Sequence, residues 1–158
     1  MRIYQYCYFT LSSAVTSASE ITAHLKMQPD RTLVQGSKRT GPPPLPRLHA
    51  WEIVHPPSGR VDDQLTCIVE RLSPVQGRLT RLMRDFPVQA TMQVVRHLNA
   101  ELGEEDNAVS SSAGSLRRLG GQHQLLGWHL DQSIIKFLVS VNAELDLDEY
   151  DDGDTSPG

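Results

Sequence analysis

The chain has few of the features that cross-link a protein or hold it in a membrane. Of its 158 residues only two are cysteine, Cys7 and Cys67, so at most one disulfide bond could form. No apolar run approaches the roughly 20 residues that a membrane-spanning helix needs. Residues 1–13 are interrupted by Gln5 and rich in tyrosine, unlike the apolar region of a secretion signal. We therefore expect a cytoplasmic protein with free thiols and no membrane contact.

The motifs of common catalytic and metal sites are also missing. His49 and His55 would share one side of a strand but lie about 20 Å apart, and no CxxC, HxxxH or HExxH spacing occurs. No turn presents a serine or cysteine beside a base. Gly120 and Gly121 are not followed by the Lys-Ser or Lys-Thr pair of a phosphate-binding loop. The sequence therefore favours a protein that is not an enzyme and has no metal or cofactor.

Charge is distributed unevenly along the chain. The net charge is -4, and eleven of the 19 acids lie in residues 101–106 and 144–154, which contain no Lys or Arg. Outside these two stretches, eight acids remain against fifteen basic residues. Such a separation can steer a charged partner. Nucleic acid is disfavoured as that partner, because the basic residues have few aromatic neighbours for base stacking and the chain is acidic in sum.

Hydrophobic periodicity predicts alternating strands and helices. A period of two predicts strands at residues 2–11, 49–55, 88–98 and 144–148, and helical spacing predicts helices at 61–72, 74–86 and after Asp131. We expect Ser17 or Ser19 to cap a short helix that ends before Pro29, and Ser73 to form a capping box with Gln76. Residues 28–47 contain five prolines and predict a long loop.

These elements predict one domain of class α+β over residues 1–150. Half-buried strands favour a two-layer sandwich, with a four- or five-stranded, mostly antiparallel sheet and helices on one face, as a variant of the ferredoxin-like fold. Residues 99–122 lack a sustained period and predict a mobile insertion. Residues 151–158 predict a disordered acidic tail.

Several short motifs resemble a family of uncharacterised proteins. They are Leu25, Pro29, Arg31 and Gly36 before the strand with Trp51, and Trp128, Leu130 and Asp131 before the acidic strand through Tyr150. In this order they resemble the bacterial domain-of-unknown-function family numbered 4279, over about residues 4–150. The resemblance implies a compact α+β domain and supplies no catalytic residue. Some members of related families look like immunity proteins that neutralise toxins, which is an analogy only.

Two functional hypotheses follow from the charges. The first is a non-enzymatic binding module in which Glu144, Asp146 and Asp148, on one face of the last strand, contact a protein partner, as in a toxin-neutralising protein of the immunity type. The alternative is a sensor or enzyme for a small anion or metabolite that uses residues 29–51, with Arg31 and Lys38 beside Trp51. A deep concavity lined by these three side chains would favour the alternative.

Two further expectations concern single side chains of the strands. Cys7 shares one strand face with apolar residues and is expected to be a buried core thiol. Val95 and the face that carries Tyr4, Tyr6 and Tyr8 are expected to be exposed, which would allow a homodimer.

Overall fold

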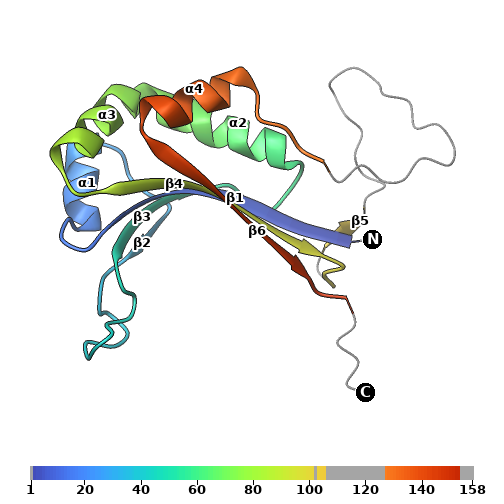
Figure 1. Ribbon diagram of the computed structural model, residues 1–158, viewed down its shortest axis with the longest axis horizontal. Helices are drawn as coiled ribbons and strands as arrows, with labels where there is room; N and C mark the ends of the chain where they lie inside the picture. Colours follow the sequence, from blue (N-terminus) through green and yellow to red (C-terminus); the bar gives the residue numbers. More distant parts are fainter. Residues whose placement is uncertain (1, 102, 106–126, 154–158) are drawn as a thin grey trace, which may run out of the picture.

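The helices of the described residues lie together on one face of a twisted sheet, and none of these helices covers the opposite face (Figure 1). The computed structural model describes residues 2–101, 103–105 and 127–153. These residues form the predicted α+β sandwich of two layers. We refer to the sheet face that carries no helix as the open face.

The chain order of the elements agrees with the predicted order except for two added short strands. The elements are β1 (Arg2–Ser13), α1 (Ala18–Leu25), β2 (Arg31–Leu33), β3 (His49–Val54), α2 (Val61–Leu72), the 3-10 turn η1 (Ser73–Val75), α3 (Gln76–Asp85), β4 (Gln89–Leu98), β5 (Glu104–Glu105), α4 (Gln132–Ser140) and β6 (Ala143–Asp151). The sheet order is β2-β3-β1-β4-β6, with β5 beside the start of β1.

Strands β4, β1, β3 and β2 are neighbours in that order and all antiparallel, with α1 and α2–α3 as the two helical connections. This is the ferredoxin-like arrangement. Helix α4 then returns the chain so that β6 joins the sheet parallel to β4, as the last described strand on that side. The predicted fold class is therefore confirmed.

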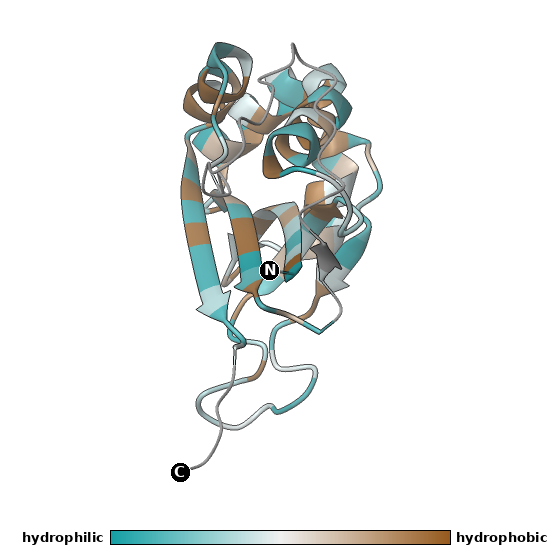
Figure 2. Cartoon of the chain, turned by 90° about the vertical axis from the view of Figure 1, so that its right-hand side faces the viewer, coloured by the Kyte–Doolittle hydropathy of each residue, from teal (hydrophilic) through white to brown (hydrophobic). Residues whose placement is uncertain are grey.

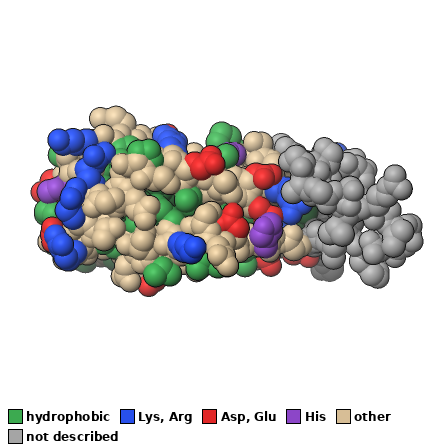
Figure 3. Space-filling view, turned by 90° about the horizontal axis from the view of Figure 1, so that it is seen from above, with side chains coloured by type: hydrophobic (Ala, Val, Ile, Leu, Met, Phe, Trp, Pro, Cys, Tyr) green, Lys and Arg blue, Asp and Glu red, His purple; other side chains and the backbone are tan. Residues whose placement is uncertain are grey.

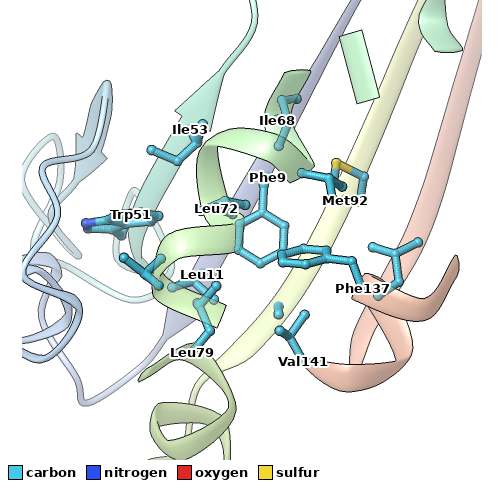
Figure 4. Packing of buried hydrophobic residues seen from close by; sticks show 14 of the residues in the cluster. Phe9, Leu11, Trp51, Ile53, Ile68, Leu72, Leu79, Met92, Phe137 and Val141 are labelled. Atoms are coloured by element: carbon cyan, nitrogen blue, oxygen red, sulfur yellow. The ribbon is translucent and has the colours of Figure 1, made fainter. Parts of the chain in front are cut away.

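The hydrophobic core lies between the two layers, because alternate strand residues point toward the helices. On β1 these are Cys7, Phe9 and Leu11, which are fully buried. The Phe9 ring meets Phe137 of α4 edge to face, with centroids 6.1 Å apart (Figure 4). The predicted burial of Cys7 is confirmed, and burial raises the pKa of its thiol to about 12.

Two helix starts follow the predicted capping chemistry. The Ser17 hydroxyl accepts from the backbone N–H of Glu20, and the Glu20 carboxylate accepts from the backbone N–H of Ser17, which is a complete capping box. The Asp131 carboxylate accepts from the backbone N–H groups of Ser133 and Ile134 at the start of α4. These bonds satisfy N–H groups that have no partner within the helix.

The capping box predicted at Ser73 is wrong. The Ser73 hydroxyl donates to the carbonyl of Val69 at 2.8 Å and so belongs to the end of α2. The Gln76 amide, expected to reach back, instead donates to the Ser140 hydroxyl at 2.7 Å. The chain continues through η1 into α3 with almost no break, so it needs no separate cap.

The predicted loop at residues 28–47 contains a strand and a second ordered segment. Strand β2 pairs with β3. Beyond it, the chain folds back on itself: Lys38 N donates to the carbonyl of Leu45 at 2.8 Å, and Leu45 N donates to the carbonyl of Arg39 at 2.9 Å. The proline-rich segment is therefore a hairpin-like projection, visible below β2 and β3 in Figure 1.

Most of the predicted insertion at residues 99–122, and the end of the predicted tail at 151–158, lie outside the described residues. Within the described part, β5 pairs with Arg2 and Ile3 of β1. Strand β6 is longer than predicted and ends at Asp151.

Candidate functional site

The open face of the sheet carries a row of aromatic side chains. Tyr4, Tyr6 and Tyr8 alternate with the core residues of β1 and therefore point away from the helices. The pairing of β1 with β4 places His97 opposite Tyr4, and the pairing of β4 with β6 places Tyr150 opposite His97. Five rings from three strands thus share one face.

These five rings form a continuous series, which we call the aromatic ladder. The ring centroids of Tyr8 and Tyr6 are 6.3 Å apart and stacked, and those of Tyr6 and Tyr4 are 5.7 Å apart. The series turns at Tyr4 toward His97, at 5.9 Å, and ends with His97 stacked on Tyr150 at 4.9 Å. Such spacings are those of favourable ring contacts. The ladder is therefore ordered by its own contacts.

Arg31 lies at the tyrosine end of the aromatic ladder, over the ring of Tyr8. Its guanidinium carbon lies 5.6 Å from the centre of the Tyr8 ring, within the range of a cation–π contact. The same guanidinium forms an ion pair with Glu52 of β3, whose side chain is only 6% exposed whereas that of Arg31 is 54% exposed. The buried carboxylate is thus neutralised by a cation that also covers an aromatic ring.

Carboxylates border the opposite side of the aromatic ladder, on β6. Glu144 and Asp146 are exposed and Asp148 is half-buried. Strand pairing places Asp148 opposite Val95, which itself lies opposite Tyr6. All three carboxylates therefore lie on the open face.

Local contacts tie these carboxylates to the sheet. The Gln89 amide donates to Glu144 at 3.1 Å, and the Gln93 amide donates to Asp148 at 3.1 Å. Burial raises the pKa of Tyr6; Tyr4, Tyr150 and Asp148 raise it further, whereas Arg31 lowers it. The Tyr6 phenol therefore stays neutral beside the acids.

Val95 does not extend this surface as expected. It lies on the open face, but it is 6% exposed because its neighbours are long side chains such as Tyr6. The expectation that Val95 is exposed is therefore wrong. The tyrosine face is half-buried and polar at its rim.

The structure does not bring together Arg31, Lys38 and Trp51, the predicted ligand-binding residues. Arg31 pairs with Glu52 on the open face, whereas Trp51 is fully buried among the helices and donates from Nε1 to the Thr22 hydroxyl at 3.1 Å. Lys38 is exposed in the hairpin-like projection. The sheet itself separates the two strand residues.

A groove does lie close to the predicted ligand region, between the start of α1 and the edge strand β2. Its volume is about 450 Å³. It is lined by Ser17, Ala18, Ser19, Thr22, Gln28, Pro29, Thr32, Val34 and His49. None of these residues is Lys or Arg. The groove therefore offers hydroxyl and amide groups but no fixed positive charge for an anion.

A cluster of charged side chains connects the start of α2 with the segment before α4. His129 Nδ1 lies 2.9 Å from a carboxylate oxygen of Asp62, and Arg60 lies 2.9 Å from the same oxygen. This cluster fastens the segment before α4 to the start of α2. No local pattern predicts this cluster, since Asp62 and His129 are 67 residues apart. Across the described ranges, no group of three His, Cys, Asp or Glu could hold a metal ion.

Basic side chains gather on a part of the surface away from the open face. Lys and Arg side chains lie together at the end of the helix layer where α1 and α3 lie (Figure 3). On α3, Arg81 and Arg84 are exposed. The carboxylates Glu144, Asp146 and Asp148 lie instead on the open face of β6.

Comparisons with known proteins identify a family but no function. No helix among the described residues has the length and apolar character needed to cross a membrane. No curated protein and no solved structure matches the chain. The model of a family described as a domain of unknown function (DUF4279) matches residues 2–152, nearly the whole chain. The chain therefore belongs to the DUF4279 family.

Proposed function

We propose that this protein is a non-enzymatic binding module that docks a positively charged region of a protein partner on the β6 side of its open face. The observation that carries the proposal is the juxtaposition of the aromatic ladder with Glu144, Asp146 and Asp148. Aromatic faces and carboxylates both attract cations. Arg31, already seated on Tyr8 and Glu52, illustrates this preference within the chain itself.

The same charges suit a fast and selective encounter. Unopposed carboxylates on one edge raise the association rate with a basic surface and repel an acidic one. A protein that neutralises a toxin by covering a basic active site would need this property, so a role of the immunity type is part of the proposal. We place the module in the cytoplasm, where its two free cysteines, Cys7 and Cys67, would remain reduced.

The test begins with capture of the partner from the native cell and its identification by mass spectrometry. Association with the purified partner is then measured by stopped flow for the wild type and for Asp146→Asn/Asp148→Asn. The matched control is Asp63→Asn/Glu70→Gln, which removes two exposed charges from α2 and changes the net charge equally.

The charge-neutralised β6 variant should associate about tenfold more slowly at low salt, with a weaker salt dependence, because steering acts over roughly one Debye length. The control variant should retain most of the wild-type rate. Equal rates for the wild type and the β6 variant would contradict the proposal.

The groove beside β2 supports a second candidate function, which is the binding of a small neutral metabolite. Its lining is mostly apolar, with a few hydroxyl and amide groups and no Lys or Arg, which favours an uncharged ligand over the anion that the sequence suggests. Neutral polyols and amides should then raise the melting temperature, while anions of similar size should not. Filling the groove with Thr32→Trp should abolish the effect, and an unchanged response would exclude this site.

A further inference from the structure

Within the described residues, strand β6 is paired on one side only. It pairs with β4 on one side, from Ala143 to Asp151. No other strand of the described part of the chain pairs with its other side. A free strand edge presents a row of backbone N–H and C=O groups, which are a template for one more strand.

Apolar side chains border this edge on the helix side. Leu145 and Leu147 alternate with the acids and are exposed, as are Ile135 and Val139 of α4, with Val139 74% exposed. Ile135 and Val139 lie on one flank of α4 because they are four residues apart. Figure 2 shows the alternating bands along β6, the strand that leads to the C-terminus, below the hydrophobic α4.

Three flanks of α4 have different surroundings. Ile134, Phe137 and Leu138 are buried against the core. The Ser140 hydroxyl accepts from Gln76 of α3 at 2.7 Å. At 100° per residue, Ile135 and Val139 lie about 140° and about 100° around the helix from Ser140, on a third flank that is exposed. The edge of β6 thus has exposed leucines on the helix side and carboxylates on the open face.

This pattern disfavours a second copy of the chain as the occupant. Two β6 strands paired so that their leucines meet would also place Glu144, Asp146 and Asp148 opposite one another. Like charges directly opposite in a sheet are destabilising. The acids therefore act against self-pairing while leaving the edge open to a strand of opposite charge.

We propose that the free edge of β6 accepts an extended segment of a partner protein, in which Lys or Arg alternates with apolar residues. Its backbone adds a strand to the sheet, its cations face the three carboxylates, and its apolar side chains cover Leu145 and Leu147. The proposal rests on the proposed function, since it specifies how a basic partner is held.

Synthetic peptides test the proposal on the intact protein. A nine-residue peptide that alternates Arg with Val is compared with a peptide of identical composition in which the Arg and Val residues are grouped. Affinity is measured by fluorescence anisotropy, and backbone amides are followed by NMR hydrogen exchange.

The alternating peptide should bind at least tenfold more tightly than the grouped one and should slow amide exchange in β6. Asp146→Asn/Asp148→Asn should weaken it, whereas Asp63→Asn/Glu70→Gln should not. Equal affinities for the two peptides, or tight binding without protection of β6, would overturn the proposal. If the peptide affinity falls in the β6 charge variant but the β6 amides are not protected, the proposed function still holds and only the added strand is refuted. If the native partner binds the β6 charge variant as fast as the wild type, the proposed function itself is refuted.

Sedimentation velocity tests the competing occupant. The wild type should be a monomer, and Glu144→Gln/Asp146→Asn/Asp148→Asn should form a dimer with protected β6 amides, because the repulsion is removed. A wild-type dimer with protected β6 amides would show that the occupant is a second copy and would overturn the proposal.

Discussion

Replacement of Arg31 by alanine tests whether this cation stabilises the folded protein through its contacts on the open face. In the folded protein its guanidinium neutralises Glu52, whose side chain is 6% exposed, and covers Tyr8. Arg31→Ala would leave a buried carboxylate without its partner. Such a loss costs about 3–5 kcal/mol when both groups are fully buried.

The cost at this position should be smaller, because the Arg31 side chain is 54% exposed and water can reach the vacated space. A charged hydrogen bond contributes about 1.5–3 kcal/mol, so we expect Arg31→Ala to lower the free energy of unfolding by about 2 kcal/mol. With an m-value of about 2 kcal/mol/M in urea, the midpoint should fall by about 1 M.

The double variant Arg31→Ala/Glu52→Gln provides the control. It removes the stranded charge and should recover about 1 kcal/mol relative to Arg31→Ala, because a neutral amide is less costly to bury than a carboxylate. Urea unfolding followed by tryptophan fluorescence measures all three proteins. The reasoning is refuted if Arg31→Ala unfolds at the wild-type midpoint, or if the double variant is no more stable than the single one.

Three further predictions concern ion pairs, thiols and a helix cap. The Arg71 side chain lowers the pKa of Asp30, so this ion pair should stabilise the fold above about pH 4. Its contribution should be lost as the pH falls through the lowered pKa. In Asp30→Asn, the free energy of unfolding should therefore depend less on pH in that range. In the native protein a thiol reagent should modify Cys67 alone, because Cys7 is buried with a pKa of about 12, and both should react after unfolding. Asp131→Ala should lower the melting temperature while Asp131→Ser retains most of it, because serine also caps a helix.

Local sequence patterns predicted most of the fold, because the core residues recur at regular spacing along the strands and helices. The alternation in residues 2–11 and 88–98 identified the two central strands, and the capping groups Ser17 and Asp131 marked two helix starts. Strands β2 and β5 have three and two residues. Such short segments carry no detectable period, so their pairing depends on tertiary contacts.

The site was harder to predict because it depends on which face of each strand is covered. Trp51 and Glu52 are adjacent in sequence but point to opposite sides of the sheet, so Arg31 meets Glu52 and cannot meet Trp51. A change of one residue in register exchanges the two faces. The aromatic ladder likewise requires the register that places His97 beside Tyr4 and Tyr150, which no local pattern contains.

The division of the sheet into a packed face and an open face limits where binding can occur. Phe9, Leu11 and Met92 commit one face to the core, so recognition by the sheet must use the other face or an edge. There the rings are already held by their neighbours before any partner arrives. Ordering side chains is a large cost of association, and a surface that is ordered in advance avoids part of it. This order in advance would lower the cost of binding the flexible basic segment that we propose as the partner.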